Sequence, residues 1–194
     1  MLVQLDHVKK EYGDFTLELD MQIPENRVIG LIGANGAGKS TTFKLMLGLI
    51  RPDAGDVKVF EKKEGELSAE DRQKIGTVFS DSGFSEYLTV QQVGRIMQEF
   101  YSDFEPEQFY RRCEYFHIPQ KKKIKEFSTG MKAKLKILLA VSHDSRLLIL
   151  DEPTAGLDVI AREEILDILR GYMEVPGRSA VLSSHISGDL EHFC

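Results

Sequence analysis

The chain has 194 residues, of which 42% are hydrophobic, enough to bury one core but short for two full domains. With 25 Lys and Arg against 31 Asp and Glu, the net charge is −6, so the surface offers no general basic field for nucleic acid and any phosphate binding must be local. The sequence lacks an apolar run near the ~20 residues of a membrane span, and its two distant cysteines, Cys113 and Cys194, exclude a disulfide framework and indicate a reducing compartment.

The first predicted elements are strands. Residues 15–21 alternate apolar and polar side chains, which favours an antiparallel sheet region at the start of the chain. Three later runs are apolar on both parities, as expected for parallel strands covered on both faces: residues 28–32, 147–150 and 180–182. Helical patterns occupy residues 40–50, 131–142 and 159–173. Strands that alternate with helices predict an α/β fold with a mainly parallel core sheet.

The middle of the chain differs in composition, because more than half of the phenylalanines and tyrosines lie between positions 79 and 116. Residues 85–130 are interpreted as a mostly helical insertion between strands of the sheet. No internal repeat or Gly/Ser-rich linker interrupts the chain, so one domain is predicted over residues 1–194.

Residues 33–40 read GANGAGKS and match the phosphate-loop pattern G-x-x-x-x-G-K-S/T. Glycines let successive N–H groups turn inward around oxygen anions, and the following helix points its positive end at the same anion. Lys39 is expected to reach the β- and γ-phosphates, Ser40 to help hold Mg²⁺, and Thr41 to line the α-phosphate side. The cradle is assigned to Gly33, Asn35, Gly36, Ala37 and Gly38. A chance Gly-rich turn is the alternative, but the position between a buried strand and a helix favours a nucleotide site.

Polar groups end two of the other apolar runs. Asp151 and Glu152 follow residues 147–150, and beside a phosphate loop Asp151 suits Mg²⁺ while Glu152 can orient and deprotonate a water aimed at the γ-phosphate. His185 also lies at a strand end, where parallel sheets bind ligands, and is expected to contact the γ-phosphate or that water. The alternatives are solvated acids and a structural histidine, and the other histidines are interpreted as structural.

The order and spacing of GANGAGKST, FSTGMKAKL, LLILDEPTAGLD and LSSH resembles the ATP-binding subunit of an ATP-binding cassette (ABC) transporter over essentially the whole chain. The resemblance implies a P-loop NTPase fold, ATP and Mg²⁺ as cofactors, and head-to-tail dimers in which each signature closes on the partner's ATP. Ser128 and Gly130 would then contact the γ-phosphate in trans, at the N-terminus of the helix predicted from Met131. An ordinary helix N-cap is the alternative, or an additional, role of Ser128.

Other residues carry over by match. Tyr12 corresponds to the aromatic residue that stacks on adenine, with packing on its strand neighbours as the alternative. Asp158 resembles the acid that links the two sites across the dimer, and it can also be the N-cap of the helix at residue 159. The lysines around the signature, at 121–123, 125, 132, 134 and 136, are interpreted as a solvated face.

The sequence departs from the family at three places. A Gln expected after residues 75–78 is replaced by Ser80, for which metal contact through water is the most that is expected. Met131 stands where Gln is commoner, a variation that resembles bacterial exporters of the ABC-2 type. The family usually continues beyond the strand that ends at His185, so truncation at the C-terminal end is expected.

The predicted function is therefore an ATPase: an ATP-binding subunit that dimerises around Mg·ATP and powers a separate membrane permease, of exporter type. The expected partners are a second ATP-binding subunit, identical or paralogous, and the permease, with the chain peripheral on the cytoplasmic face of the membrane. The aromatic-rich insertion either lines a groove for a short helix of the permease or forms only the core of its subdomain. A soluble ABC switch on ribosomes or DNA is the alternative; it predicts tandem cassettes, a long coiled coil or a basic surface. A plain P-loop kinase or GTPase would leave FSTGM without a role.

Overall fold

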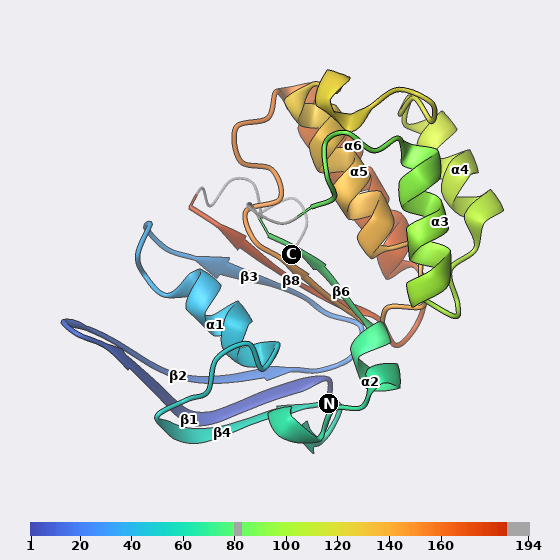
Figure 1. Cartoon of the computed structure of the whole chain (residues 1–194). Helices are drawn as coiled ribbons and strands as arrows, with labels where there is room; N and C mark the ends of the chain where they lie inside the picture. The colour runs from blue at the N-terminus through green and yellow to red at the C-terminus, as the bar shows by residue number, and fades with distance from the viewer. Residues whose placement is uncertain (80–82, 186–194) are drawn as a thin grey trace.

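The computed structural model describes residues 1–79 and 83–185 and, within them, contains two four-stranded sheets (Figure 1). The antiparallel sheet has the order β2-β1-β4-β5 and comprises β1 (Val3–Tyr12), β2 (Phe15–Ile23), β4 (Ala54–Val59) and β5 (Lys62–Lys63). The parallel sheet has the order β3-β8-β7-β6 and comprises β3 (Val28–Ile32), β6 (Ile75–Val78), β7 (Leu147–Leu150) and β8 (Ser179–Ser184). The predicted α/β architecture with an N-terminal antiparallel region is confirmed, whereas the predictions on Ser80 and Cys194 fall outside the described residues.

The helices of the described chain lie around these sheets. They are α1 (Lys39–Met46), α2 (Ala69–Gln73), α3 (Val90–Phe100), α4 (Pro106–Tyr115), α5 (Thr129–Ala140) and α6 (Val159–Met173), with short 3-10 turns η1 (Glu64–Glu66) and η2 (Ile124–Glu126). Figure 1 shows α1 between the two sheets and α3 to α6 together on the other side of the parallel sheet. Among the described residues no helix combines the length and the apolar character needed to cross a membrane.

Two hydrophobic cores follow from this layering, and the central strands contribute to both. Leu147 and Ile149 of β7 pack in the core that contains Phe43 of α1 and the antiparallel sheet. Leu148 and Leu150 pack in the second core, with α3 to α6. Because successive side chains of a strand point to opposite faces, a fully apolar run is what a strand between two cores requires. The prediction of burial on both faces is therefore confirmed for this strand.

The same prediction is wrong for residues 28–32. Strand β3 is only partly buried, and Ile32 at its end is 59% exposed. The reason is the strand order, because within the described residues β3 pairs with β8 on one side and occupies the edge of the sheet. Local apolar content does not reveal which strand is central.

The segment between β6 and β7 is helical, in agreement with the predicted helical insertion. Thr89 and Gln92 form a reciprocal capping box at the start of α3, and Pro106 occupies the first turn of α4. Helix α5 begins at Thr129, two residues earlier than predicted, because the Ser128 side chain accepts a hydrogen bond from the Met131 N–H at 3.2 Å.

Candidate nucleotide site

Three neighbouring strands bring the predicted residues to one edge of the parallel sheet. Strands β3, β8 and β7 are adjacent and parallel, so their carboxyl ends lie together. The phosphate loop follows β3, His185 follows β8, and Asp151 and Glu152 follow β7. The loop is tied to the next strand by the Gly33 N–H, which donates to the Ser184 carbonyl at 3.3 Å.

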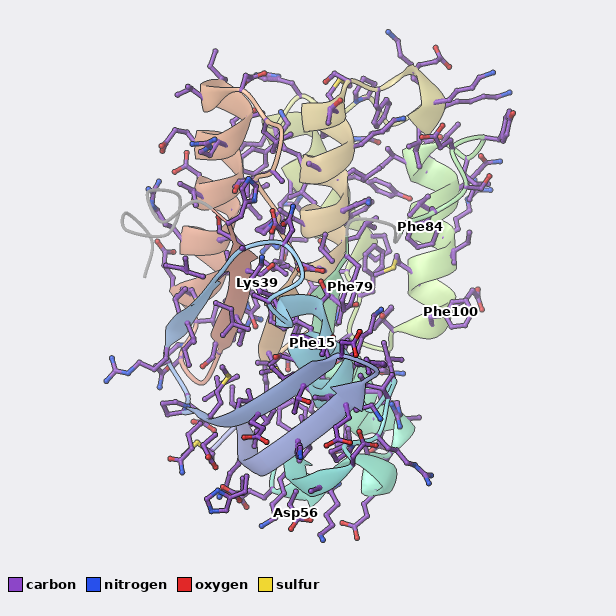
Figure 2. The ribbon with its side chains drawn as sticks, turned by 90° about the vertical axis from the view of Figure 1, so that its left-hand side faces the viewer. Phe15, Lys39, Asp56, Phe79, Phe84 and Phe100 are labelled. Carbon is purple, nitrogen blue, oxygen red and sulfur yellow. The ribbon has the colours of Figure 1, made fainter. Side chains whose placement is uncertain are left out.

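The loop adopts a backbone that requires glycine at two positions. Gly36 has φ +83° and Gly38 has φ +94°, both in the left-handed region. Gly38 is also enclosed, because an added Cβ would lie 2.9 Å from Leu17 and 3.1 Å from Phe15 of β2. The antiparallel sheet therefore packs directly on the loop, and Figure 2 shows Phe15 on the same side of the molecule as Lys39.

Lys39 begins α1 and folds back over the loop. Its Nζ donates to the Gly33 carbonyl at 2.7 Å and to the Ala34 carbonyl at 3.3 Å, and it lies 3.3 Å from Glu152 Oε1. Its side chain is only 10% exposed. The ammonium is thus held at the mouth of the cradle by groups that a bound phosphate would replace as partners.

Asp151 connects the loop with β8. The Ser40 hydroxyl donates to Asp151 Oδ2 at 2.6 Å, and the Ser183 hydroxyl donates to Oδ1 at 2.6 Å. Asp151 is only 7% exposed. Both of its carboxylate oxygens accept a hydrogen bond, as buried polar groups generally do.

Glu152 has an unusual backbone and lies between two basic side chains. Its φ is +51°, a rare value for a residue with a side chain, and its N–H donates to Ser183 Oγ at 2.8 Å. Glu152 Oε1 faces Lys39, and Oε2 lies 2.5 Å from His185 Nδ1. The turn after β7 therefore aims this carboxylate across the mouth of the phosphate loop.

The residues at this edge fit a magnesium ion bound together with a nucleotide. Ser40 and Asp151 offer the hard oxygen ligands that Mg²⁺ selects. Within residues 1–79 and 83–185 no group of three or more His, Cys, Asp or Glu side chains could hold a metal by itself. Such a sparse set suits Mg²⁺, which keeps several waters and takes its other ligands from phosphates.

The remaining predicted residues lie on the loop, in the first turn of α1 and at the end of β1. Asn35 and Ala37 are exposed on the loop, and Thr41 is half-buried in the first turn of α1. Tyr12 ends β1, is 46% exposed and lies with the Lys10 Nζ 5.5 Å from its ring centroid. It pairs in register with Phe15, whose ring borders the loop, so an open aromatic face is available beside the cradle.

The signature and the acid at 158 each have a local role in the structure. Ser128 caps α5 and is exposed, and Asp158 caps α6 by accepting from the Ala161 N–H at 2.8 Å. Gly130 lies against α6, since an added Cβ would come within 2.9 Å of the Ala161 Cβ. These contacts establish the N-cap alternatives, and they leave the end of α5 open for a further contact.

The lysines near the signature do not form one solvated face. Those at 121, 122, 123 and 125 are exposed, as predicted. Lys134 is 6% exposed and donates to the Phe116 carbonyl at 3.0 Å and to Glu164 at 2.8 Å, so the prediction is wrong there. Lys132 pairs with Glu86 at 2.5 Å. Helix α5 packs against α4 and α6, which turns one side of it away from solvent.

A groove of about 1000 Å³ runs from this site to the helical segment. Its lining includes Glu152 at one end and Phe79, Phe84, Phe100 and His143. In the view of Figure 2, Phe79 lies between Lys39 and the other two phenylalanines. His143 is buried and stacks on the Tyr101 ring at 4.1 Å, and burial lowers the pKa of its imidazole.

Sequence reasoning missed Ser183, which contacts both Asp151 and Glu152. The available signal was its position in the sequence: Ser183 lies near the carboxyl end of β8, two residues before His185, which follows the strand. Phe15 and Leu17 were assigned to a half-buried strand, but nothing local indicated that they pack on Gly38.

Comparison with known proteins gives concordant matches. A family model described as "ABC transporter" matches residues 17–155. The lantibiotic transport ATP-binding protein SrtF of Streptococcus pyogenes is 34% identical over 98% of this chain and 83% of its own length. The bacitracin transport ATP-binding protein BcrA of Enterococcus faecalis is 31% identical over 98% of this chain, which spans 63% of that protein. A solved structure of the ATP binding subunit of an ABC transporter superposes with TM-score 0.87 at 25% identity, over 100% of this chain and 83% of that one.

Proposed function

Since this chain belongs to the ABC transporter family, as an ATP-binding subunit with the ATPase fold, we propose that it binds Mg·ATP at residues 33–41, dimerises around two nucleotides and hydrolyses them to drive a separate membrane permease. The observation that carries the catalytic part is the line of Lys39, Glu152 and His185 beside the Ser40–Asp151 pair. Residues 1–194 are proposed to act as one ATPase domain, with 85–130 as its helical subdomain.

The reaction is an in-line attack of water on the γ-phosphorus. Glu152 accepts a proton from the water as the P–O bond forms, and the bond to the bridging oxygen breaks, so that its electrons leave with ADP. His185 holds the Glu152 carboxylate from one side, and we assign it to the γ-phosphate or the attacking water. Ser40 and Asp151 would hold Mg²⁺, which would neutralise part of the phosphate charge.

Lys39 changes partners when the nucleotide binds. Without a phosphate it is held by the Gly33 and Ala34 carbonyls and by Glu152. A β- or γ-phosphate oxygen carries more charge than these carbonyls, and a charge-assisted hydrogen bond is about twice as strong as a neutral one. Transfer of Lys39 to the phosphates frees Glu152 Oε1 for the attacking water.

The second protomer completes the pocket. Ser128 and Gly130 lie at the exposed N-terminus of α5, where unpaired N–H groups and the helix dipole attract an anion. We assign them to the γ-phosphate held by the partner subunit, with Asp158 near the junction and Tyr12 stacked on the adenine. The partner is a second copy or a paralogue.

The names of the relatives support a role in export. They include proteins of lantibiotic transport, bacitracin transport and Nod factor export. The groove beside α3 and α5 suits a short helix of the permease, which would place this chain on the cytoplasmic face of the membrane. The net charge of −6 disfavours the alternative of a switch on ribosomes or DNA.

Glu152→Gln tests the proposal. The amide keeps the shape of the side chain but cannot take the proton, so hydrolysis should fall by roughly 10²–10⁴ while ATP binding persists. In Mg·ATP the variant should run as a stable dimer in size-exclusion chromatography with light scattering, and as a monomer without nucleotide. Glu174→Gln, on the exposed end of α6, is the matched control and should behave like the wild type. Undiminished hydrolysis in the Glu152 variant would remove this residue from its role.

A further inference from the structure

One buried hydroxyl contacts both acidic residues of the site. Ser183 on β8 has no exposed surface, and its Oγ donates to Asp151 Oδ1 at 2.6 Å while it accepts from the Glu152 N–H at 2.8 Å. A serine hydroxyl has one proton to donate, so this donor is committed to Asp151. Ser183 is the second-last residue of β8, and His185 directly follows this strand.

The backbone of Glu152 needs such a contact. A residue with a side chain at φ +51° is strained and persists only where its surroundings hold it. The hydrogen bond from the Glu152 N–H to Ser183 anchors the backbone of this turn, whereas Lys39 and His185 contact only the end of the side chain.

The backbone of the turn is otherwise held by the Asp151 N–H, which donates to the Val78 carbonyl at 2.8 Å, and by the Ala155 N–H, which donates to the Glu152 carbonyl at 3.2 Å. Loss of the Ser183 contact would leave the Glu152 N–H without its acceptor and loosen the position of the carboxylate relative to the phosphate loop.

The carboxylate of Asp151 is held by the same hydroxyl. Ser183 binds Oδ1 and thereby leaves Oδ2 directed at Ser40, on the side where the magnesium ligands meet. Removing the Ser183 hydroxyl would leave a buried carboxylate oxygen without its partner and let the group turn about its last bond.

We propose that Ser183 is a positioning residue that sets the metal-side carboxylate and the general base in one geometry, from the end of the strand that His185 follows. The inference rests on the proposed ATPase function. Ser183 lies outside both the phosphate loop and the DEPTAGLD stretch, and its proposed role is to keep two successive acidic residues correctly positioned relative to the nucleotide.

The chain supplies a matched control on the same strand. Ser179, four residues earlier on β8, is equally buried, donates to the Pro24 carbonyl at 2.8 Å and accepts from the Arg27 N–H at 3.2 Å. It likewise donates one hydrogen bond and accepts one, but its acceptor is a neutral carbonyl and it lies at the opposite end of the strand from the site. Ser179→Ala therefore reports what the loss of a buried hydroxyl does to stability alone.

The experiment compares Ser183→Ala, Ser183→Cys, Ser183→Thr and Ser179→Ala in the full chain. Ser183→Ala should lower kcat by about 10², the cost of a small misplacement of the reacting groups, with KM for ATP within about twofold of the wild type. The Mg²⁺ concentration that half-saturates the binding of a fluorescent ATP analogue should rise by about tenfold, as expected for loss of an outer partner of a metal ligand. Ser183→Thr, which keeps the hydroxyl, should recover most of both quantities.

The controls separate a positioning role from a structural one. Ser179→Ala should shift the urea unfolding midpoint about as much as Ser183→Ala and leave kcat and the Mg²⁺ requirement unchanged. If Ser183→Ala does not fold, Ser183→Cys carries the test, because it preserves the volume with a weak donor. The inference is overturned if turnover and Mg²⁺ dependence in the Ser183 variants change no more than in Ser179→Ala. That outcome together with an inactive Glu152→Gln leaves the ATPase function standing, whereas an active Glu152→Gln removes both.

Discussion

Gly38 meets two demands at a single position of the phosphate loop. Its φ of +94° places it in the left-handed region, and the side chains of Leu17 and Phe15 lie within 3.1 Å of where a Cβ would be. Gly36 shares the first demand, with φ +83°, but has open space around it. Backbone strain and steric crowding can therefore be separated within one loop.

Alanine at position 38 should lower the free energy of unfolding in urea more than alanine at position 36. Gly36→Ala should cost about 1–2 kcal/mol through left-handed strain alone. Gly38→Ala should cost an additional ~1–3 kcal/mol, because β2 must move away from the loop. Gly65→Ala is the control, since Gly65 has neither a positive φ nor a neighbour near its Cβ position. Equal losses at positions 36 and 38 would contradict the packing of β2 on the loop.

Helices α5 and α6 are in close contact at the signature. Gly130 of α5 faces Ala161 of α6, where a Cβ added to the glycine would lie 2.9 Å from that of the alanine. A glycine at this position can thus serve the packing of two helices, the proposed contact with the partner's nucleotide, or both. The two roles predict different results for a compensating substitution. If Gly130 serves packing only, both stability and ATP hydrolysis should recover; if it also contacts the nucleotide, only stability should recover.

Moving the methyl group across the helix interface tests which role applies. Gly130→Ala alone should lower the free energy of unfolding by about 1–3 kcal/mol through overpacking. Gly130→Ala combined with Ala161→Gly removes the clash and should return stability to within about 1 kcal/mol of the wild type, the cost of a glycine in a helix. ATP hydrolysis by the double variant should stay low, because the new methyl is attached directly beside the residue-130 N–H that is proposed to approach the partner's nucleotide. Recovery of hydrolysis together with stability would show that Gly130 serves packing only.

The elements differ in how far local sequence could reveal them. The run at β7 and the acidic residues after it were predictable because burial on both faces and a polar strand end are visible in a few residues. The edge position of β3 was not, since strand order depends on pairing between segments far apart in the chain. Lys134 looked like part of a basic surface run, and only the packing of α5 against its neighbours shows that it is buried and paired. Ser183 was hidden in an otherwise ordinary strand because its partners come from β7.

On the scale of the whole molecule, the role of the groove can be tested by comparing an exposed aromatic residue that lines it with an equally exposed aromatic residue that does not. Phe100 is 70% exposed and lines the groove, whereas Tyr115 is 76% exposed and does not. Both rings belong to the helical segment, on α3 and α4. A difference between their alanine variants therefore reports on the groove and not on exposed aromatics in general.

Phe100→Ala should weaken binding to the permease while leaving basal hydrolysis within about twofold of the wild type. Loss of a buried aromatic anchor costs about 2 kcal/mol or more, roughly 30-fold in Kd. The measurement is co-purification: the chain is co-expressed with the proposed permease, the permease is purified in detergent, and the amount of the chain recovered with it is determined. Tyr115→Ala should be recovered like the wild type. Equal recovery of both variants, or loss of hydrolysis in Phe100→Ala, would contradict docking in this groove.

Strand β7, which Asp151 follows, is anchored in both cores, by Leu147 and Ile149 in one and by Leu148 and Leu150 in the other. The acidic residues thus follow the strand that joins the two cores, the one formed with α3 to α6 and the one formed with α1 and the antiparallel sheet. A permease that pulls on α3 to α6 must strain this strand before the motion reaches the antiparallel sheet. Movement of the permease would then displace the two carboxylates first. The site that hydrolyses ATP would therefore also be the site that responds to the permease.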